Sequence, residues 1–196
     1  MVTVPNSARL AYRLFNLDDV HTASQDLDDI WQVDQDPEVM KYLTNGVTTS
    51  KEVLKNVYIP RLKSYTDIDK GFGMWRISLA DCDTFIGELI MRPMHFGSDN
   101  PHQHDIELGW RFIRKYWGQG YATEAADHLM RWKAQDPIVK RFSAIADTNN
   151  KASTAIMKKL GMRFITHEIH QDPLGDVEVD RYSLDVADLN TDKTNQ

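Results

Sequence analysis

Two glycines stand one residue apart in RKYWGQGYATEAADHLM, residues 114–130, between a cationic, aromatic run and a helical pattern. Gly118 and Gly120 carry no side chains, so a ligand can approach the backbone closely at both positions. The first amides of a helix lack partners within the helix, and the helix dipole makes that end positive. The stretch therefore has the features of a site that holds phosphate on backbone N–H groups.

Two familiar phosphate-binding motifs do not describe this loop. A Walker loop has Lys and then Ser or Thr after its last glycine, whereas Tyr121 and Ala122 follow Gly120. The dinucleotide-binding fingerprint has a third small residue where Thr123 stands. Taken alone, the two glycines are equally compatible with an ordinary turn that opens a helix.

Further motifs surround the loop in a fixed order. DPEVMKYL and DIELGWRF precede it, and GYATEA, Asn150-x-x-Ser153 and Lys159-Leu160-Gly161-Met162 follow. Together with the loop Lys115-Tyr116-Trp117-Gly118-Gln119-Gly120, these pieces resemble the GCN5-related N-acetyltransferases (GNAT). They are most similar to the RimJ/RimL-like branch, which acetylates ribosomal-protein N-termini. The matches cover most of residues 7–186, and the one departure is Lys115, where the family has Gln or Arg.

The resemblance implies that acetyl-CoA binds where two central strands of a twisted, mostly antiparallel sheet splay apart. Its pyrophosphate would lie on the amides of residues 116–121, and its pantetheine arm would follow the end of strand 104–113. Asn150 has an alternative role as a helix N-cap, and Trp117 and Tyr121 have one in packing against the protein. The residues expected to bind the co-substrate are Phe112, Ile113, Lys115, Tyr116, Trp117, Gly118, Gln119, Gly120, Tyr121 and Asn150.

Amide formation by direct attack on a thioester needs a base for the amine and a proton for the departing thiolate. Glu107, on the polar face of strand 104–113, is the predicted base, acting directly or through water. The alternative for Glu107 is an ion pair with Arg111, and Glu88 is the rival base. Ser153 is predicted to donate the proton, with a bond to the carbonyl of the preceding turn as its alternative.

Hydrophobic periodicity and turn signals predict an α+β chain with a mixed sheet flanked by helices. Pro60 is expected to bend or interrupt its helix, and Gly161 to end another. A single domain is predicted over residues 7–186, followed by a polar tail at 187–196. The helical patterns cover 17–33, 36–43, 49–68, 119–134 and 149–161, and the strand patterns cover 7–14, 71–80, 84–94, 104–113, 139–147 and a closing hairpin around the turn DPLGD.

Composition argues against several other classes of protein. The 196 residues are 41% apolar, enough for one core, and the net charge of -6 disfavours nucleic acid as a partner. No apolar run approaches the roughly 18–20 residues of a membrane span, so we expect a cytoplasmic protein without a membrane partner. Cys82 stands alone, and His95, His102 and His104 lack a firm ligand spacing, so no metal is expected. The sequence leaves a homodimer open.

The expected acceptor is a primary amine, such as a protein N-terminus, bound with help from residues 28–70. A small amine, for example an antibiotic, a polyamine or an amino acid, is the alternative acceptor. The acidic stretch DLDD at 26–29 would either attract a cationic acceptor or form a solvated surface. A non-catalytic CoA-binding regulatory module is the alternative from another functional class.

Overall fold

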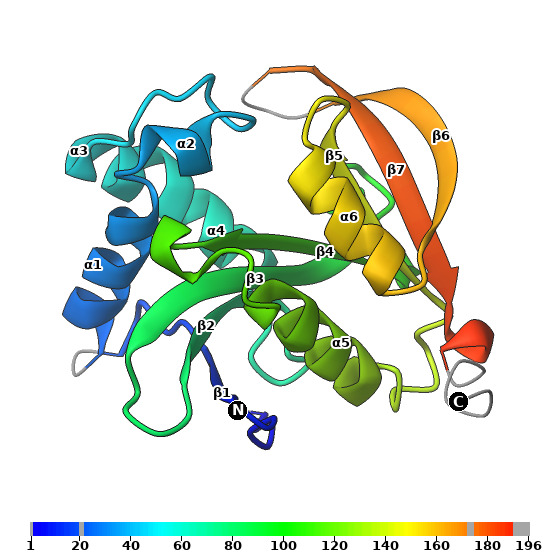
Figure 1. The fold of residues 1–196 in the computed structure, drawn as a ribbon, viewed down its shortest axis with the longest axis horizontal. Helices are drawn as coiled ribbons and strands as arrows, with labels where there is room; N and C mark the ends of the chain where they lie inside the picture. Colours follow the sequence, from blue (N-terminus) through cyan, green and yellow to red (C-terminus); the bar gives the residue numbers. More distant parts are fainter. Residues whose placement is uncertain (1, 20–21, 172–174, 190–196) are drawn as a thin grey trace. The chain divides into compact units, whose positions relative to one another are not determined.

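The computed structural model describes residues 2–19, 22–171 and 175–189 (Figure 1). Its strands are β1 (Leu10–Leu14), β2 (Gly73–Leu79), β3 (Phe85–Met94), β4 (His102–Phe112), β5 (Arg141–Asp147), β6 (Arg163–His170) and β7 (Val177–Asp185). They form one sheet in the order β1-β2-β3-β4-β5-β7-β6. β4 and β5 pair in parallel, whereas β1 with β2, β2 with β3, β5 with β7, and β6 with β7 pair antiparallel.

Helical segments connect and flank these strands. They are α1 (Ala23–Val33), α2 (Pro37–Met40), α3 (Lys51–Val53), the π-helix η1 (Leu54–Tyr58), α4 (Ile59–Tyr65), the 3-10 helix η2 (Arg114–Tyr116), α5 (Tyr121–Lys133), α6 (Lys151–Lys159) and the 3-10 helix η3 (Val186–Asp188). The predicted α+β class with a mostly antiparallel sheet is confirmed. Parts of the expected hairpin turn, at 172–174, and of the expected tail, at 190–196, lie outside the described residues.

The chain divides into two compact units, and the single domain over 7–186 stays a prediction. The first unit contains Met1–Met91 and Trp110–Ala125. The second contains Arg92–Gly109 and Ala126–Gln196. No helix in the described ranges is both long and apolar enough to cross a bilayer.

In the first unit, helices cover an apolar cluster on the sheet. Partly buried side chains such as Met74 and Ile113 pack against it. Burial of such side chains is worth roughly 1.5–3 kcal/mol each, which fixes these helices on the strands. The buried members of the cluster are Phe15, Ile30, Val33, Leu54, Leu62 and Phe85.

The buried face of α1 also carries acids, contrary to the expectation of a solvated DLDD stretch. Asp26 and Asp29 are buried beside Ile30 and Val33, at spacings that place all four on one helix face. They lie there because arginines of the sheet neutralise them. The pairs are Asp26 with Arg13 of β1, Asp29 with Arg76 of β2, and Asp34, the C-cap of α1, with Arg111 of β4.

The helical stretch that contains Pro60 is interrupted, as predicted. Ser50 caps its start by accepting a hydrogen bond from the Val53 amide at 3.1 Å. Proline has no N–H, and its ring collides with the carbonyl four residues earlier in an α-helix. The chain avoids this conflict by widening into the π-helix η1 just before α4, in which Pro60 occupies the first turn.

In the second unit, β5 lies between β4 and β7. Its parallel ladder with β4 is short, running from Asp105 opposite Arg141 to Glu107 opposite Ser143. The ladder of β5 with β7 continues as far as Asp147. Of the described residues of β5, those at 144–147 therefore pair with β7 only, which agrees with the divergence that the resemblance implies.

Gly87 of β3 allows a close approach within the first unit. A Cβ atom at this position would lie 2.6 Å from the Arg111 carbonyl oxygen and 2.7 Å from the Phe112 ring. Real Cβ atoms do not come so near to backbone atoms, so the main chain itself would have to move. The Ile113 amide donates to the Ile86 carbonyl at 3.0 Å beside this contact, which holds the two segments together.

We predict that Gly87→Ala lowers the free energy of unfolding by about 1–3 kcal/mol, the usual range for overpacking. Urea titration followed by circular dichroism measures this difference. Gly97→Ala is the control, since its Cβ would meet nothing within 4 Å, and it should change the value by less than about 0.5 kcal/mol. Equal effects of the two substitutions would contradict the close approach at Gly87.

Candidate functional site

The glycine loop is open and presents unpaired amides. Gly118 and Gly120 have φ angles of 74° and 82°, in the left-handed region that favours glycine. A Cβ at Gly118 would meet nothing within 4 Å. Within the described part of the chain, the amides of residues 118–123 make no hydrogen bond, whereas the Trp117 amide binds the Arg114 carbonyl and the Glu124 amide binds the Gly120 carbonyl.

The start of this loop is anchored by local bonds. The Trp117 indole N–H donates to the Phe112 carbonyl at 2.7 Å, although the side chain remains 45% exposed. The Gln119 side chain donates to the Lys115 carbonyl at 3.0 Å. Phe112 and Ile113 are expected to bind pantetheine, but the Phe112 carbonyl and the Ile113 amide already have partners in the chain. Trp117 is not a core residue, since its ring stands at the surface.

Residues from the N-terminal segment hold the other end of the loop. Arg9 donates through Nε to Glu124 at 2.6 Å and through Nη1 to the Gln119 carbonyl at 3.1 Å. Its guanidinium lies 4.4 Å from the centre of the Tyr121 ring. Glu124 also accepts from the Ser7 hydroxyl at 2.7 Å. Partial burial alone would raise the pKa of Glu124, but these hydrogen bonds hold it below its ordinary value.

Glu107 is buried in the second unit and paired with an unexpected partner. Arg92 binds both of its carboxylate oxygens, with Nε–Oε2 and Nη2–Oε1 distances of 2.9 Å. The Arg92 guanidinium also lies 3.8 Å from the centre of the Phe96 ring. The sequence pointed to Arg111 as the alternative partner, which is wrong because Arg111 binds Asp34 instead. Glu107 is only 5% exposed, so the face of β4 expected to be polar is covered at this position.

Glu88 of β3 is buried in the first unit with an unusual charge environment. It forms an ion pair with Arg111, which also binds Asp34, so two carboxylates share one guanidinium. Neither Glu88 oxygen has a hydrogen-bond partner among the described residues beyond that ion pair. Burial raises the pKa of Glu88 to about 7, since the attraction of Arg111 is partly offset by the charge of Asp34.

The start of α6 distinguishes two neighbouring hydroxyl groups. Asn150 caps the helix, because its side-chain oxygen accepts from the Ser153 amide at 3.1 Å. Thr154, not Ser153, makes the bond to the carbonyl of the preceding turn, at 3.1 Å to Asn150. Within the described residues, the half-buried Ser153 hydroxyl therefore makes no hydrogen bond and is available to a ligand.

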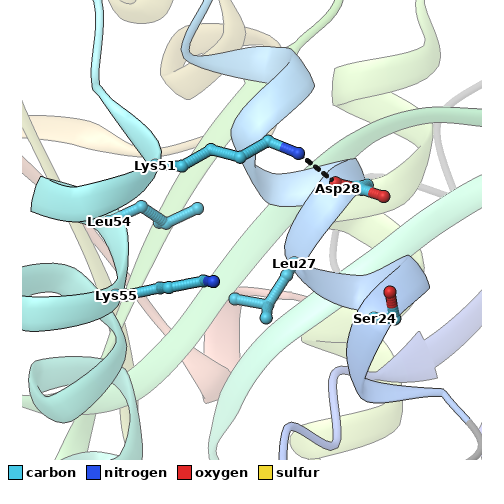
Figure 2. A pocket seen from close by; sticks show the side chains of 6 residues that line it. All are labelled: Ser24, Leu27, Asp28, Lys51, Leu54 and Lys55. Atoms are coloured by element: carbon cyan, nitrogen blue, oxygen red, sulfur yellow. Dashed lines mark hydrogen bonds and ion pairs between the residues drawn. The ribbon is translucent and has the colours of Figure 1, made fainter.

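A small pocket lies elsewhere in the first unit, between α1 and the segment formed by α3 and η1. Figure 2 shows Lys51 bound to Asp28, at 2.8 Å, and Lys55 extending toward Leu27. The side chains of the pocket offer two cations, one acid and an apolar wall, but no pair suited to acid–base catalysis. The lining residues are Ser24, Leu27, Asp28, Lys51, Leu54 and Lys55.

Two of the three histidines considered as metal ligands in the sequence form a ring contact, whereas a ring nitrogen of His104 lies 2.9 Å from the Ile138 carbonyl. His95 and His102 lie edge to face, with ring centres 4.8 Å apart. Burial, together with the neighbouring His102, lowers the pKa of His95. Among the described residues, no group of three or more His, Cys, Asp or Glu side chains is placed to hold a metal ion.

The predicted site residues fall into two groups, one in each compact unit. The first unit brings together Phe112, Ile113 and the loop at 115–121, and the second brings together Asn150 and Ser153 and contains Glu107. The sequence did not single out Arg9 or Arg92. Arg9 meets Glu124 across 115 positions of sequence, so no local pattern signals that contact.

Most of the chain matches a known protein family. Residues 17–163 match the family described as the acetyltransferase (GNAT) domain. The uncharacterized N-acetyltransferase YnaD of Bacillus subtilis (strain 168) is 29% identical over 136 residues, which cover 68% of this chain and 71% of YnaD.

Solved structures share the fold. RimL, a ribosomal L7/L12 alpha-N-protein acetyltransferase in complex with coenzyme A, aligns with a TM-score of 0.68 and 17% identity over 93% of this chain and 97% of its own. A spermidine N-acetyltransferase from Vibrio cholerae, in complex with CoA and spermine, aligns with a TM-score of 0.67 and 13% identity, covering 92% and 98%. With a family match over most of its length and this shared fold, the chain belongs to the GNAT acetyltransferases.

Proposed function

We propose that this enzyme transfers an acetyl group from acetyl-CoA to a primary amine, with the diphosphate of the co-substrate on the loop at 115–121. The observation that carries the proposal is the run of amides at residues 118–123 that have no partner among the described residues, beside open space at Gly118. Successive free N–H groups at a helix start suit the oxygens of a diphosphate. The CoA complexes of two proteins of the same fold support the choice of ligand.

The remaining co-substrate contacts follow from groups that the chain leaves free. Asn150 uses its side-chain oxygen as a helix cap, so its amide nitrogen remains to donate a hydrogen bond. Phe112 and Ile113 have less to offer pantetheine, because the Phe112 carbonyl and the Ile113 amide are already bound, the Phe112 ring is buried, and Ile113 packs against the apolar cluster. The exposed Trp117 ring offers a further apolar surface to the ligand.

The reaction is a direct displacement. The amine nitrogen attacks the thioester carbon, a C–N bond forms, the C–S bond breaks, and the products are an amide and CoA. The attacking amine loses a proton to a base, and the departing sulfur gains one from a donor. We assign the donor to Ser153, because Thr154 takes the local carbonyl and the Ser153 hydroxyl has no partner among the residues that the structure describes.

Two carboxylates compete for the role of base. Glu107, which the resemblance favours, holds both oxygens against Arg92, so it would act through water or after one of these bonds breaks. Glu88 is the stronger candidate on physical grounds, because a pKa near neutrality balances the fraction ionised against the strength of the base. Its neighbours Arg111 and Asp34 would keep it in place.

The acceptor is proposed to be a protein N-terminal amine, as in the RimJ/RimL-like branch. RimL and the spermidine acetyltransferase are nearly equal in their likeness to this chain, so the fold does not choose between a protein and a polyamine. The pocket in Figure 2 falls mostly in the region predicted to help bind the acceptor. Its two ammonium groups against one carboxylate disfavour a polycation there.

We predict that the purified protein releases CoA from acetyl-CoA when offered peptides with free N-termini, and less rapidly with polyamines. Gly120→Glu should weaken acetyl-CoA binding at least tenfold, because the new carboxylate repels the diphosphate and strains the backbone at a φ of 82°. Thiol release and isothermal titration calorimetry measure the two quantities.

Gly46→Glu is the matched control, since Gly46 has a similar φ of 80° and lies outside the loop. It should bind acetyl-CoA as the unaltered enzyme does. Unchanged affinity in Gly120→Glu would overturn the placement of the diphosphate. Binding without turnover across a broad amine panel would favour the alternative, a CoA-binding regulatory module.

A pH profile distinguishes the two carboxylates. With Glu88 as the base, kcat/KM should rise up to tenfold per pH unit below about 7 and level off above, because only the ionised carboxylate accepts a proton. Glu88→Gln should remove this limb, whereas Glu107→Gln should keep it. A profile with the limb intact in Glu88→Gln and no turnover in Glu107→Gln would return the role to Glu107. Each profile uses the same acceptor amine, so the ionisation of that amine affects all the profiles equally.

Removing the hydroxyl of Ser153 tests the proton donor. Ser153→Ala should lower kcat by about 10²-fold with little change in acetyl-CoA affinity, as loss of general acid catalysis does. Thr154→Val, a neighbouring hydroxyl deletion whose bond is purely local, should retain kcat within a few fold. Similar rates for the two variants would remove Ser153 from the mechanism.

A further inference from the structure

Arg9 is tied to the loop proposed for the diphosphate through three different groups. Its Nε binds Glu124, its Nη1 binds the Gln119 carbonyl, and its guanidinium lies over the Tyr121 ring. The Arg9 backbone amide also donates to Glu124, at 3.0 Å. A side chain that is 46% exposed is thus fixed at several points, all of them in the first unit.

The bond to the Gln119 carbonyl controls an amide of the loop. The peptide between Gln119 and Gly120 is planar and trans, so its C=O and N–H point in opposite directions. When Arg9 holds the oxygen, the orientation of the Gly120 N–H is set as well. Glycine tolerates other backbone angles at low cost, so this peptide would rotate readily without such a tether.

The second terminus of the guanidinium remains free for a further contact. Within the described residues, Nη2 of Arg9 has no hydrogen-bond partner, and it would lie 3.6 Å from a Cβ placed on Gly120. Lysine cannot reproduce this arrangement, because a single ammonium lacks the planar fork that reaches a carboxylate and a carbonyl together.

We propose that Arg9 is a positioning residue for the diphosphate site, which orients the Gly120 amide before the co-substrate binds. The proposal rests on the proposed function of the loop. Preorganisation of this kind raises affinity, because the ordering of the loop is complete before the ligand arrives. Glu124 contributes to this positioning, because its carboxylate binds the guanidinium of Arg9 that in turn binds the loop.

The test compares donors with and without the diphosphate. Arg9→Gln and Arg9→Lys should raise KM for acetyl-CoA about tenfold, and by the same factor for acetyl-dephospho-CoA, while kcat stays within twofold. S-acetylpantetheine lacks the diphosphate, so its kcat/KM should not change. Arg141→Gln removes an arginine whose side chain is about as exposed as that of Arg9 and which binds Asp185 at 2.8 Å, and it should leave every value unchanged.

Equal losses with acetyl-CoA and S-acetylpantetheine, or no loss in either Arg9 variant, would overturn the inference. A second measurement does not depend on the co-substrate. In the free protein, Arg9→Gln should shift or broaden the Gly120 amide resonance in a ¹H–¹⁵N spectrum, while Arg141→Gln leaves it in place. An unchanged Gly120 resonance would contradict the tether. Failure of the unaltered enzyme to bind CoA would instead end the proposed function of the loop.

Discussion

Glycine precedes the first turn of α5, and in the part of the chain that the structure describes, neither the first amides of this helix nor the amides just before it have an acceptor. Unpaired backbone donors are costly where water cannot reach them, which requires this stretch to stay exposed. The surrounding contacts serve the same requirement. Trp117 binds the Phe112 carbonyl at the start of the loop, and Arg9 binds the Gln119 carbonyl near its end. These bonds fix the backbone conformation without using the N–H donors.

Charge, rather than apolar contact alone, joins α1 to the strands of the first unit. Buried ion pairs add little net stability, since the loss of hydration offsets the attraction between the partners. Their clearer effect is geometric, because each arginine fixes one carboxylate at a definite strand. In the triad of Asp34, Arg111 and Glu88, burial raises the pKa of Glu88, and the charge of Asp34 partly offsets the attraction of Arg111, so Glu88 holds its proton to a higher pH than an exposed glutamate.

The sequence predicted the fold well because its signals are local. Alternating residues marked the strands, Gly161 marked a helix end, and Pro60 marked the interruption at η1. The partners of charged residues were harder to predict. Glu107 belongs to Arg92 rather than to Arg111, and the acids of α1 are buried, because pairing across strands depends on register and packing that local spacing does not encode. The roles proposed for the site residues are predictions as well, because they too depend on side chains that are distant in the sequence.

The contact between Arg9 and Glu124 spans 115 positions of the chain. Closing so long a loop carries a larger entropic cost than closing a helix turn or a hairpin, and contacts of this kind slow folding. The glycine stretch therefore acquires its final shape only after distant segments have met. A ribosome-bound chain that ends before residue 124 cannot form the pair between Arg9 and Glu124, so this restraint on the loop arises only when nearly all of the first unit has been synthesised.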